Sequence, residues 1–441
     1  MDFGARTEGR PVRRITLLVA VALAITVTAT CPAAEPVSIE IGNLATMDLA
    51  KEWLDHEIAA FMKAHPNVQV KVLPYSDPDR DLNPVHTNPF LPKNIIGLDS
   101  RAGCEAAYLA EKGDLVPVDH FLPDPDFDKN QFYDNYWDAV TYGGKVWGVP
   151  WQVWSDLLVC DMEIFKAAGI AEPPKTIHEL IDMVPKLTNL EGKIEQYGLR
   201  VSMRIDPLLD WLMTLTLQQG GRIVKDNQIT ASDPALRSSA ELLVKLVANT
   251  PSVNAQPGDV IKFEFPDRRF AMQLVQTRHL TAILGQKKYR VVPVPTLTND
   301  QFLCPRRLYF AIRKGSDAEE RSSWELIKWL VRKDVSMPRA PLGFPCRKDI
   351  VDRPEFKAWA QKGPEGLSEI FTYTAQQHDL GPFVLNRGAA ISEWGTQLRP
   401  LLTGNTDYDR VLADAAGGAN KLLVVLPDYR ATGKKPLSMY E

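Results

Sequence analysis

The sequence contains none of the short motifs that mark common enzyme active sites. GxSxG, HExxH, GxGxxG and the phosphate-loop pattern GxxxxGKS or GxxxxGKT are absent from its 441 residues. The nucleophile elbow of hydrolases, the helical zinc site of metalloproteases and the glycine-rich phosphate loops therefore have no counterpart. The 7 histidines are scattered, with no two three or four residues apart. We expect a protein that is not an enzyme. A secreted glycoside hydrolase stays a distant alternative, because 55 Asp and Glu residues can supply two carboxylates at glycosidase spacing by chance.

Cysteine is scarce, and its spacing argues against the common structural metal sites. The chain has 5 cysteines, none in a CxxC pair and none near a histidine at ligand spacing, so we expect neither a metal nor a cofactor. Four cysteines follow Cys31, and in an oxidising compartment they allow three complete pairings. Buried free thiols are an equally open alternative. The four are Cys104, Cys160, Cys304 and Cys346.

Long apolar runs are lacking, with one exception near the amino terminus. Residues 15–27 are apolar and follow two arginines. This length fits the ~7–15 residues of a signal-peptide core and falls short of the ~20 that span a bilayer. We expect residues 1–34 to be a signal peptide and the mature protein to be exported and soluble, in the periplasm or another extracytoplasmic space. Lipidation of Cys31 is an alternative, although Thr-Ala-Thr at 28–30 is a poor lipidation signal.

The chain also lacks a strong excess of one charge. Its net charge is −4 at pH 7, and four of its arginines belong to the first 31 residues. A mildly acidic body argues against nucleic acid or an anionic membrane surface as a partner. The length of 441 residues exceeds one ordinary core, so two domains are expected.

The apolar residues that are present recur at strand and helix spacings. Residues 36–41 and 68–72 alternate as strands, and apolar positions in 48–65 repeat every three to four residues as in a helix. This strand–helix–strand unit is typical of parallel sheets with ligand sites at the carboxyl ends of strands. Thr176-x-x-Glu179 and Ser316-x-x-Glu319 predict two further helix starts as capping boxes.

The order of motifs resembles the extracellular solute-binding proteins of bacterial ABC importers. Residues 142–180 contain a Gly-Val-Pro-Trp strand followed by a Pro-Pro-Lys-Thr helix start, 61–72 read FMKAHPNVQVKV, and 289–295 read YRVVPVP. The most similar group is the carbohydrate-binding family 1, which includes maltose-binding protein. The resemblance covers nearly the whole mature chain but depends on motif order, not on one diagnostic residue. Residues 75–93, rich in Pro, Asp and Asn, depart from the family pattern.

The resemblance implies an α/β fold of the two-lobed periplasmic-binding-protein type (type II). Each lobe would hold a mixed sheet flanked by helices, and three hinge segments would cross between the lobes. The predicted division is 36–145 plus 265–311 for lobe one and 146–264 plus 312–426 for lobe two, with 427–441 as a tail.

The resemblance also implies a set of ligand-binding residues in the cleft between the lobes. Trp394 and Trp151 are expected as aromatic walls, whereas Trp211 is expected in the core. Arg278 stands where the family commonly has a tryptophan. The predicted ligand-binding set is Asp99, Arg101, Trp151, Arg204, Asp206, Arg278, Phe344, Arg347 and Trp394.

The implied function is capture of a solute by hinge closure and its delivery to the transmembrane subunits of an ABC permease, by a monomer. A sugar or oligosaccharide is the first expectation, because 10 Trp and 12 Tyr can supply stacking surfaces. The arginines among the expected site residues keep an anionic sugar, an organic acid or a phosphorylated solute as the alternative. A structural or adhesive exported protein is a further alternative. A cleft lined by aromatic residues would distinguish a solute-binding protein from this class.

Overall fold

Two large β-sheets organise the part of the chain that the computed structural model describes. The described residues are 36–42, 48–73, 92–99, 109–138, 140–200, 205–225, 228–248, 268–277, 280, 283, 285–298, 306–336, 344–376, 387–402 and 406–422. Residues 1–35, with the predicted signal peptide and Cys31, form a separate unit outside them. The predicted tail 427–441 and nearly all of 75–93 also lie outside the described residues.

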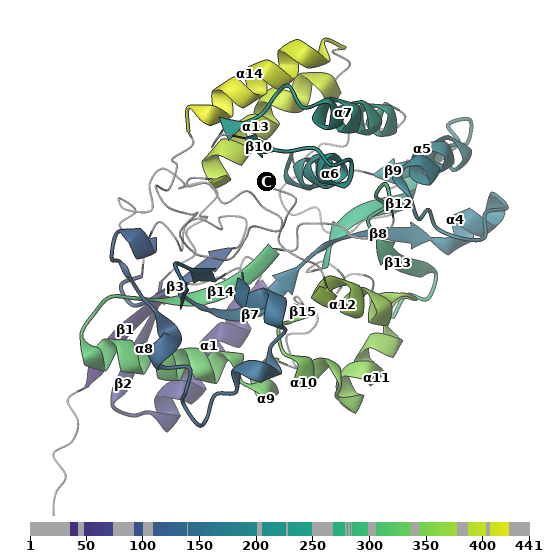
Figure 1. Ribbon diagram of the computed structural model, residues 1–441. Coiled ribbons are helices and arrows are strands. Elements are labelled where there is room, and N and C mark those ends of the chain that lie inside the picture. Colours follow the sequence, from purple (N-terminus) through teal and green to yellow (C-terminus); the bar gives the residue numbers. More distant parts are fainter. Residues whose placement is uncertain are drawn as a thin grey trace, which may run out of the picture. The chain divides into compact units, whose positions relative to one another are not determined.

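The first sheet is mixed and joins strands from distant parts of the sequence (Figure 1). Its strands are β1 (Val37–Gly42), β2 (Val68–Leu73), β3 (Ile95–Asp99), β4 (Leu115–Val116), β7 (Val149–Trp154), β14 (Arg306–Arg313) and β15 (Phe344–Pro345). Their order is β15-β7-β14-β3-β1-β2, and β4 also pairs with β14. β1 is parallel to β2 and β3, whereas β14 is antiparallel to β3 and β7. Because β14 lies between them, β3 and β7 run in the same direction.

The predicted strand–helix–strand unit is confirmed at the start of this sheet. Helix α1 (Asp48–Ala64) connects β1 to β2. Its apolar residues Leu54, Ile58 and Phe61 are buried, as their helical spacing predicts. Pro66 stops the helix, because proline cannot continue its backbone hydrogen bonds.

The second sheet is also mixed and has four strands. They are β8 (Asp156–Asp161), β9 (Glu195–Arg200), β12 (Arg268–Gln276) and β13 (Tyr289–Pro293), in the order β13-β8-β12-β9. β9 is parallel to β12, and β8 is antiparallel to both of its neighbours. The helices of this region are α4 (Met162–Ala167), α5 (Ile177–Lys186), α6 (Ile205–Gln218), α7 (Pro234–Val247), α13 (Arg387–Leu402) and α14 (Tyr408–Asn420).

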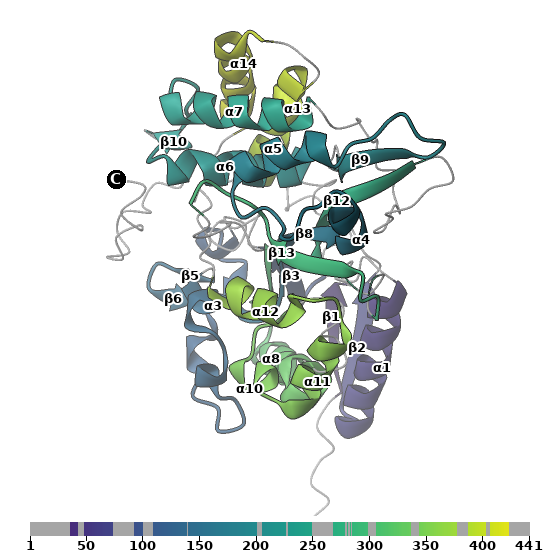
Figure 2. The ribbon, with the colours of Figure 1, turned by 90° about the vertical axis from the view of Figure 1, so that its right-hand side faces the viewer.

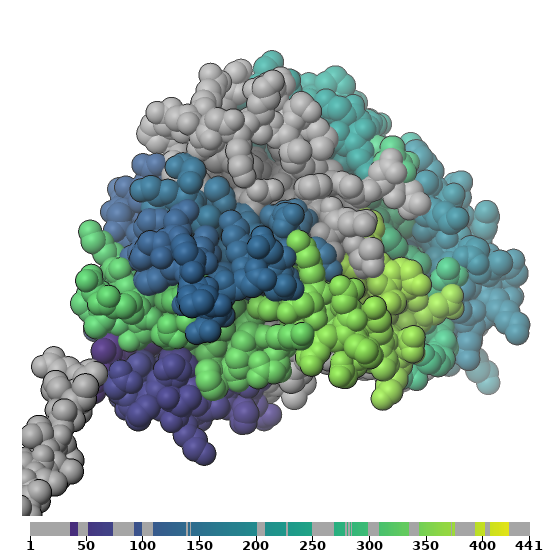
Figure 3. All heavy atoms as spheres, turned by 60° about the horizontal axis from the view of Figure 1, so that its bottom comes forward, coloured from purple at the N-terminus to yellow at the C-terminus, as the bar shows by residue number. Residues whose placement is uncertain are grey.

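Shorter elements complete the described part (Figure 2). The small strands pair as two hairpins, β5 (Thr141–Tyr142) with β6 (Lys145–Val146), and β10 (Val224–Lys225) with β11 (Gln228–Ile229). The short helices are η2 (Val118–His120), η3 (Lys129–Gln131), α3 (Asp134–Asp138), α9 (Lys333–Ser336), α10 (Lys348–Val351), α11 (Pro354–Lys362) and α12 (Leu367–Gln376); the longer α8 (Asp317–Val331) packs on the first sheet. Figure 3 shows one face on which helices of the 317–376 region (green) lie beside residues 48–73 (purple) and 109–148 (blue).

Both predicted helix caps form, with one difference in detail. The hydroxyl of Ser316 accepts from the Glu319 backbone N–H (3.3 Å), and the Glu319 carboxylate accepts from the Ser316 N–H (2.8 Å). At α5 the Thr176 hydroxyl accepts from the Glu179 N–H (3.2 Å), but the Glu179 carboxylate reaches Lys175 instead of the cap residue. The local pattern therefore predicts both helix starts correctly.

The strand pairing departs from the predicted lobe boundaries. β12 and β13, expected with the amino-terminal part, pair with β8 and β9 in the second sheet. β7 and β15, expected with the second lobe, pair in the first sheet, against which α8 also packs. The reason is that an apolar strand carries no local signal of the sheet it joins, because partners distant in sequence decide the pairing.

Two hydrophobic clusters form the core. One surrounds the first sheet and includes Ile39, Trp137 and Phe310, and the other includes the buried faces of α5, α6, α7, α13 and α14. None of the helices in the described part combines the length and the apolarity that crossing a membrane requires.

Candidate functional site

The carboxyl ends of four strands of the first sheet share one edge. β1, β2, β3 and β7 run in the same direction, so the edge carries Gly42, Leu73, Asp99 and Trp154. In α/β sheets this edge is where ligands bind, because the loops that follow the strands gather there. The amino terminus of α1 lies at the same edge, since α1 follows β1.

At this edge the chain passes from one sheet directly into the other. β7 ends at Trp154, Ser155 follows, and β8 begins at Asp156. The backbone N–H of Ser155 donates to the Thr277 hydroxyl (3.2 Å), and the Thr277 N–H donates to the Ser155 carbonyl oxygen (2.9 Å). Both residues are 2% exposed. These bonds fix the carboxyl end of β12 to the point where the chain crosses between the sheets.

Polar residues at the ends of three strands of the second sheet, β8, β9 and β12, lie on the same side as Ser155, where the chain crosses between the sheets. Asp156 pairs with Gln276, the last residue of β12. Because β9 is parallel to β12, its last residue, Arg200, is directed to the same side of the sheet. The amino terminus of α6 follows β9 after four residues. The carboxyl ends of strands from both sheets therefore meet near Ser155.

Buried polar side chains lie at this point and along the strands that lead to it, with Gln152 three residues before Ser155 and Gln273 four residues before Thr277. We call Gln152, Ser155, Asp156, Gln273 and Thr277 the crossing cluster; each is at most 8% exposed. Buried polar groups ordinarily have hydrogen-bond partners, because burial removes their water. The buried Gln273 Oε1 accepts from no described residue. The cluster thus offers amide, hydroxyl and carboxylate groups, which suit recognition of polar solutes.

The described residues offer no arrangement for metal binding. Among them no group of three His, Cys, Asp or Glu side chains is placed to hold a metal ion. The two described cysteines, Cys160 and Cys346, are buried free thiols, and burial raises the pKa of the Cys160 thiol. No disulfide bond therefore joins Cys160 to Cys346. Cys104 and Cys304 lie outside the described residues.

Five of the predicted site residues have side chains that the structure does not describe. Asp99 is the last residue of β3 and Asp206 the second of α6, and only their backbone is placed. Arg101, Arg204 and Arg278 lie outside the described residues. Their described neighbours Asp99, Ile205 and Thr277 are at the strand and helix ends that surround the crossing. Their roles stay predictions.

Trp151 lies in an aromatic stack within the first sheet. Its ring is 6.4 Å from that of Trp53 in α1, with 17° between the planes, and 5.1 Å from that of Phe310 in β14. It is 9% exposed. This packing joins α1 to the sheet just below the edge, and a contact of Trp151 with solute stays a prediction.

The remaining three predicted residues make other contacts. Phe344 is buried against Phe371, with ring centroids 4.0 Å apart. The Arg347 guanidinium donates to both carboxylate oxygens of Asp349 (2.9 and 2.8 Å) and lies over the Phe132 ring. Phe344 is therefore held by packing and Arg347 by an ion pair, and a contact of either with solute stays a prediction.

Trp394 differs most from its prediction. Predicted as an aromatic wall in front of a helix, it lies inside α13 and is 0% exposed, and its contact with solute stays a prediction. The helix begins earlier than predicted, at Arg387, and the Trp394 side chain packs in the second hydrophobic cluster. Trp211 is buried as predicted, and its indole N–H donates to the Pro295 carbonyl oxygen (2.8 Å).

The crossing cluster was missed from the sequence, although a signal exists. Gln152 and the Ser155-Asp156 pair interrupt an otherwise apolar run, VPWQVWSDLLVC, that has no turn residues. A polar pair inside such a run marks a place where a strand leaves one environment and enters another.

The comparisons with known proteins identify the family. The sequence profile described as "Bacterial extracellular solute-binding protein" matches residues 57–364, which is more than half of the chain. The chain therefore belongs to this family of binding proteins, whose members act outside the cytoplasm. A comparison with curated protein sequences gives no match.

Solved structures agree with this assignment at the level of the fold. The maltose-bound MalE3 of T. maritima is 18% identical, with a TM-score of 0.69 over 88% of this chain and 100% of that chain. The sugar-binding protein MalE from Xanthomonas citri is 18% identical, with a TM-score of 0.71 over 88% and 97%. UgpB from Mycobacterium tuberculosis, in complex with glycerophosphocholine, is 15% identical, with a TM-score of 0.70 over 88% and 98%. The protein has the two-lobed α/β fold of these binding proteins.

Proposed function

We propose that the protein is the substrate-binding component of an ABC importer and that its solute is a sugar or oligosaccharide. The observation that carries this proposal is the crossing cluster, whose buried amide, hydroxyl and carboxylate groups lie at or within four residues of the point where the chain passes from one sheet to the other. Such groups match pairs of sugar hydroxyls, which both donate and accept hydrogen bonds. Two of the structures with the same fold are sugar-binding proteins by their own descriptions.

In this proposal each sheet is the centre of one lobe, and solute capture closes the lobes around the crossing. The short link at Ser155 suits a hinge, because few backbone angles need to change to move one sheet against the other. The closed form would then dock on the transmembrane subunits of a permease. The protein would act as a monomer and would bind its solute without chemical turnover.

Export by residues 1–34 belongs to the same proposal. Cleavage near Ala33 or Ala34 would release a periplasmic protein, and lipidation would instead leave Cys31 as the first residue. The mass of the protein secreted by a bacterial host separates these outcomes, because a lipid adds several hundred daltons to the amino-terminal residue. Retention of residues 1–31 on the exported protein would refute both.

A thermal-shift screen followed by calorimetry tests the sugar assignment. The panel would contain maltose, longer maltooligosaccharides, cyclic oligosaccharides, simple sugars, a sugar alcohol and glycerophosphocholine. We expect one saccharide to raise the melting temperature and to bind with a stoichiometry of one. Recovery of that saccharide uncleaved after long incubation supports a binder, and steady release of smaller sugars would refute the absence of turnover.

An anionic solute is the second candidate, because Arg200 ends β9 as a buried cation on the ligand-facing side of the second sheet. A guanidinium binds carboxylate, sulfate or phosphate through two parallel hydrogen bonds. If the predicted site residue Arg278 also binds such a solute, Arg278→Ala should weaken binding by the ~1.5–3 kcal/mol of hydrogen bonds to charged groups. Added salt should weaken it as well. Arg269→Ala, at an exposed position of β12, is the matched control. Tight, salt-independent binding of a neutral oligosaccharide that Arg278→Ala leaves unchanged would exclude this candidate.

A further inference from the structure

A second connection joins the two sheets beside the chain at Ser155. Residues 361–376, here called the strap, comprise the end of α11, a turn and α12. The strap runs from β13, an edge strand of the second sheet, to β15, an edge strand of the first. Each of these edge strands neighbours the strand that forms the crossing, β8 or β7. Figure 2 shows α12 between β13 and the helices α10 and α11.

Hydrogen bonds attach the amino-terminal half of the strap to β13. The backbone N–H of Val291 donates to the Glu365 carbonyl oxygen (2.8 Å), and the Glu365 N–H donates to the Tyr289 carbonyl oxygen (3.3 Å). The Lys287 ammonium, in the turn before β13, donates to two carbonyl oxygens of the strap (2.7 and 2.8 Å). Because hydrogen bonds are directional, these four contacts hold the strap in one position on the strand.

Gly366 lets the strap approach β13 this closely. Its φ of 86° lies in the left-handed region, which residues with a side chain rarely adopt. A Cβ at this position would lie 2.1 Å from the Val291 carbonyl oxygen. Any other residue at position 366 would therefore push the strap away from the strand.

Aromatic packing attaches the carboxyl-terminal half of the strap to the first sheet. The Phe371 ring of α12 lies 4.0 Å from the Phe344 ring of β15, and Phe371 is 3% exposed. Phe344 pairs in turn with Val153 of β7. The Tyr136 hydroxyl of α3, a helix that contacts β7, donates to the Thr374 carbonyl oxygen (3.5 Å). The two halves of the strap are therefore held by different sheets.

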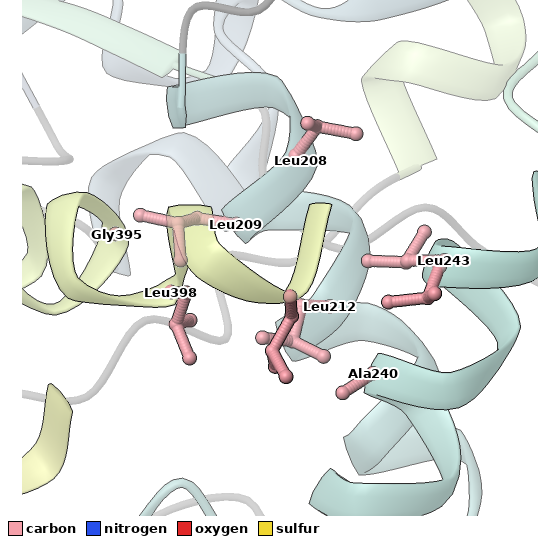
Figure 4. A pocket seen from close by; sticks show the side chains of 9 residues that line it. Leu208, Leu209, Leu212, Ala240, Leu243, Gly395 and Leu398 are labelled. Carbon is pink, nitrogen blue, oxygen red and sulfur yellow. The ribbon is translucent and has the colours of Figure 1, made fainter. Parts of the chain in front are cut away.

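The helices of the second lobe pack together as one body. Leucines of α6, α7 and α13 converge on one another (Figure 4). The six that are at most 6% exposed are Leu208, Leu209, Leu212, Leu243, Leu398 and Leu401. Close-packed interiors have low compressibility, so these helices move with one another. Movement between the lobes therefore depends on the contacts that join the sheets, and the strap supplies part of them.

The strap and the candidate site lie on opposite sides of the crossing. In the first sheet β15 is on one side of β7 and β3 is on the other, and in the second sheet β13 is on one side of β8 and β9 is on the other. When two bodies turn about a link, points on opposite sides of the link move in opposite directions. Closure that brings the carboxyl ends of β3 and β9 together therefore moves β15 away from β13 and stretches the strap.

We propose that the strap restrains lobe closure and thereby sets the affinity for solute. This inference rests on the proposed function, because it concerns the hinge closure that captures the solute. The hydrogen bonds to β13 and the packing on β15 stabilise the open arrangement, so part of the free energy of solute binding is used to release them. A strap that is held less firmly raises the fraction of the closed form, and the apparent dissociation constant falls in proportion.

Calorimetry on Lys287→Met tests the proposal at an exposed position. Methionine keeps an unbranched side chain but removes both hydrogen bonds from the ammonium to the strap. We expect the affinity for the identified solute to rise at least about threefold. Gly366→Ala should raise it further, since the added Cβ forces the strap off β13. Lys288→Met is the matched control and should leave the affinity unchanged, because the Lys288 ammonium lies 3.4 Å from the Asp161 carboxylate of the same sheet.

Hydrogen exchange follows the strap directly. Saturating solute should speed exchange of the Val291 amide at least about tenfold as the strap leaves β13, and should not speed exchange of the Thr277 amide, which is bonded at the crossing. A role in stability alone would lower the melting temperature of Lys287→Met and Gly366→Ala without raising their affinity. That result, with a solute that still compacts the protein, would overturn the restraint while the proposed function stands.

X-ray scattering of the solute-free protein tests the strap even if no solute in the panel binds, an outcome that counts against the proposed function. Gly366→Ala should have a smaller radius of gyration than the parent, because release of the strap favours the closed form. A radius equal to that of the parent would overturn the restraint.

Discussion

At the scale of single residues, the crossing cluster stands out because its side chains are polar where strands are otherwise apolar. Leu157, Leu158 and Val159 follow Asp156 directly and are fully buried. Burying Asp156 or Gln273 beside them costs free energy unless each finds a partner. The contribution of these residues to stability therefore depends on their hydrogen-bond partners, as for the Ser155–Thr277 pair.

Thr277→Val should weaken both the fold and solute binding. Valine keeps the shape of the side chain but removes the oxygen that accepts from the Ser155 N–H. A buried N–H without an acceptor costs ~1–3 kcal/mol. Chemical denaturation and calorimetry with the identified solute measure the two effects. Thr216→Val is the control, since this hydroxyl is equally buried but donates within α6, to the Leu212 carbonyl oxygen. If both variants behave alike, the Ser155–Thr277 pair has no special role.

Arg347→Ala should lower stability without changing solute affinity. The guanidinium makes two short hydrogen bonds to Asp349, and both side chains are largely buried. Losing a charge-assisted pair of this kind costs ~1.5–3 kcal/mol. Arg353→Ala is a useful comparison, because its contact with Glu355 is longer (3.6 Å) and more exposed, and should change stability by less than ~0.5 kcal/mol. A weaker affinity at unchanged melting temperature would instead support the predicted contact of Arg347 with solute.

At the scale of helices and strands, the sequence predicts correctly those features that depend on residues close together along the chain. The caps at Thr176 and Ser316 depend on residues three apart, and both helices start as predicted. The sheet that β12 joins depends on partner residues 73 positions away in β9 and more than 100 positions away in β8, and no local pattern indicates them. The position of Trp394 within α13 has a related reason, because it depends on where this helix begins and on what packs against it.

Ser316→Ala should destabilise α8 by ~1 kcal/mol, the usual cost of losing a polar cap. The loss should depend on pH, because the backbone N–H and hydroxyl of Ser316 hold the pKa of Glu319 below its usual range. A lowered pKa in the folded state adds stability above the unfolded value of about 4.3, and this part fades as pH falls through the folded pKa. Denaturation at pH 7 and near pH 3 compares the two conditions. We expect the difference between variant and parent to shrink at the lower pH, and a constant difference would contradict the role of Glu319.

At the scale of the whole molecule, the family and the fold agree, and the proposed solute has a thermodynamic signature. A ligand at about 100 times its dissociation constant stabilises the folded state by ~2.7 kcal/mol. We therefore expect a rise of several degrees in melting temperature that grows with the logarithm of ligand concentration. X-ray scattering should record a smaller radius of gyration with solute bound, since closure brings the lobes together. A solute that stabilises the protein without compacting it would argue against hinge closure.

The position of β14 in the first sheet affects how the chain reaches its native state during synthesis. β14 lies between β3 and β7, although residues 306–313 are made more than 150 residues after β7. Until they emerge, β3 and β7 each lack the neighbour that saturates their backbone groups, and such open edges invite pairing with other chains. Contacts this distant in sequence also form slowly. A nascent chain cut short before residue 306 would therefore be prone to aggregate, and the unpaired state of β3 and β7 lasts until about seven tenths of the polypeptide has been made.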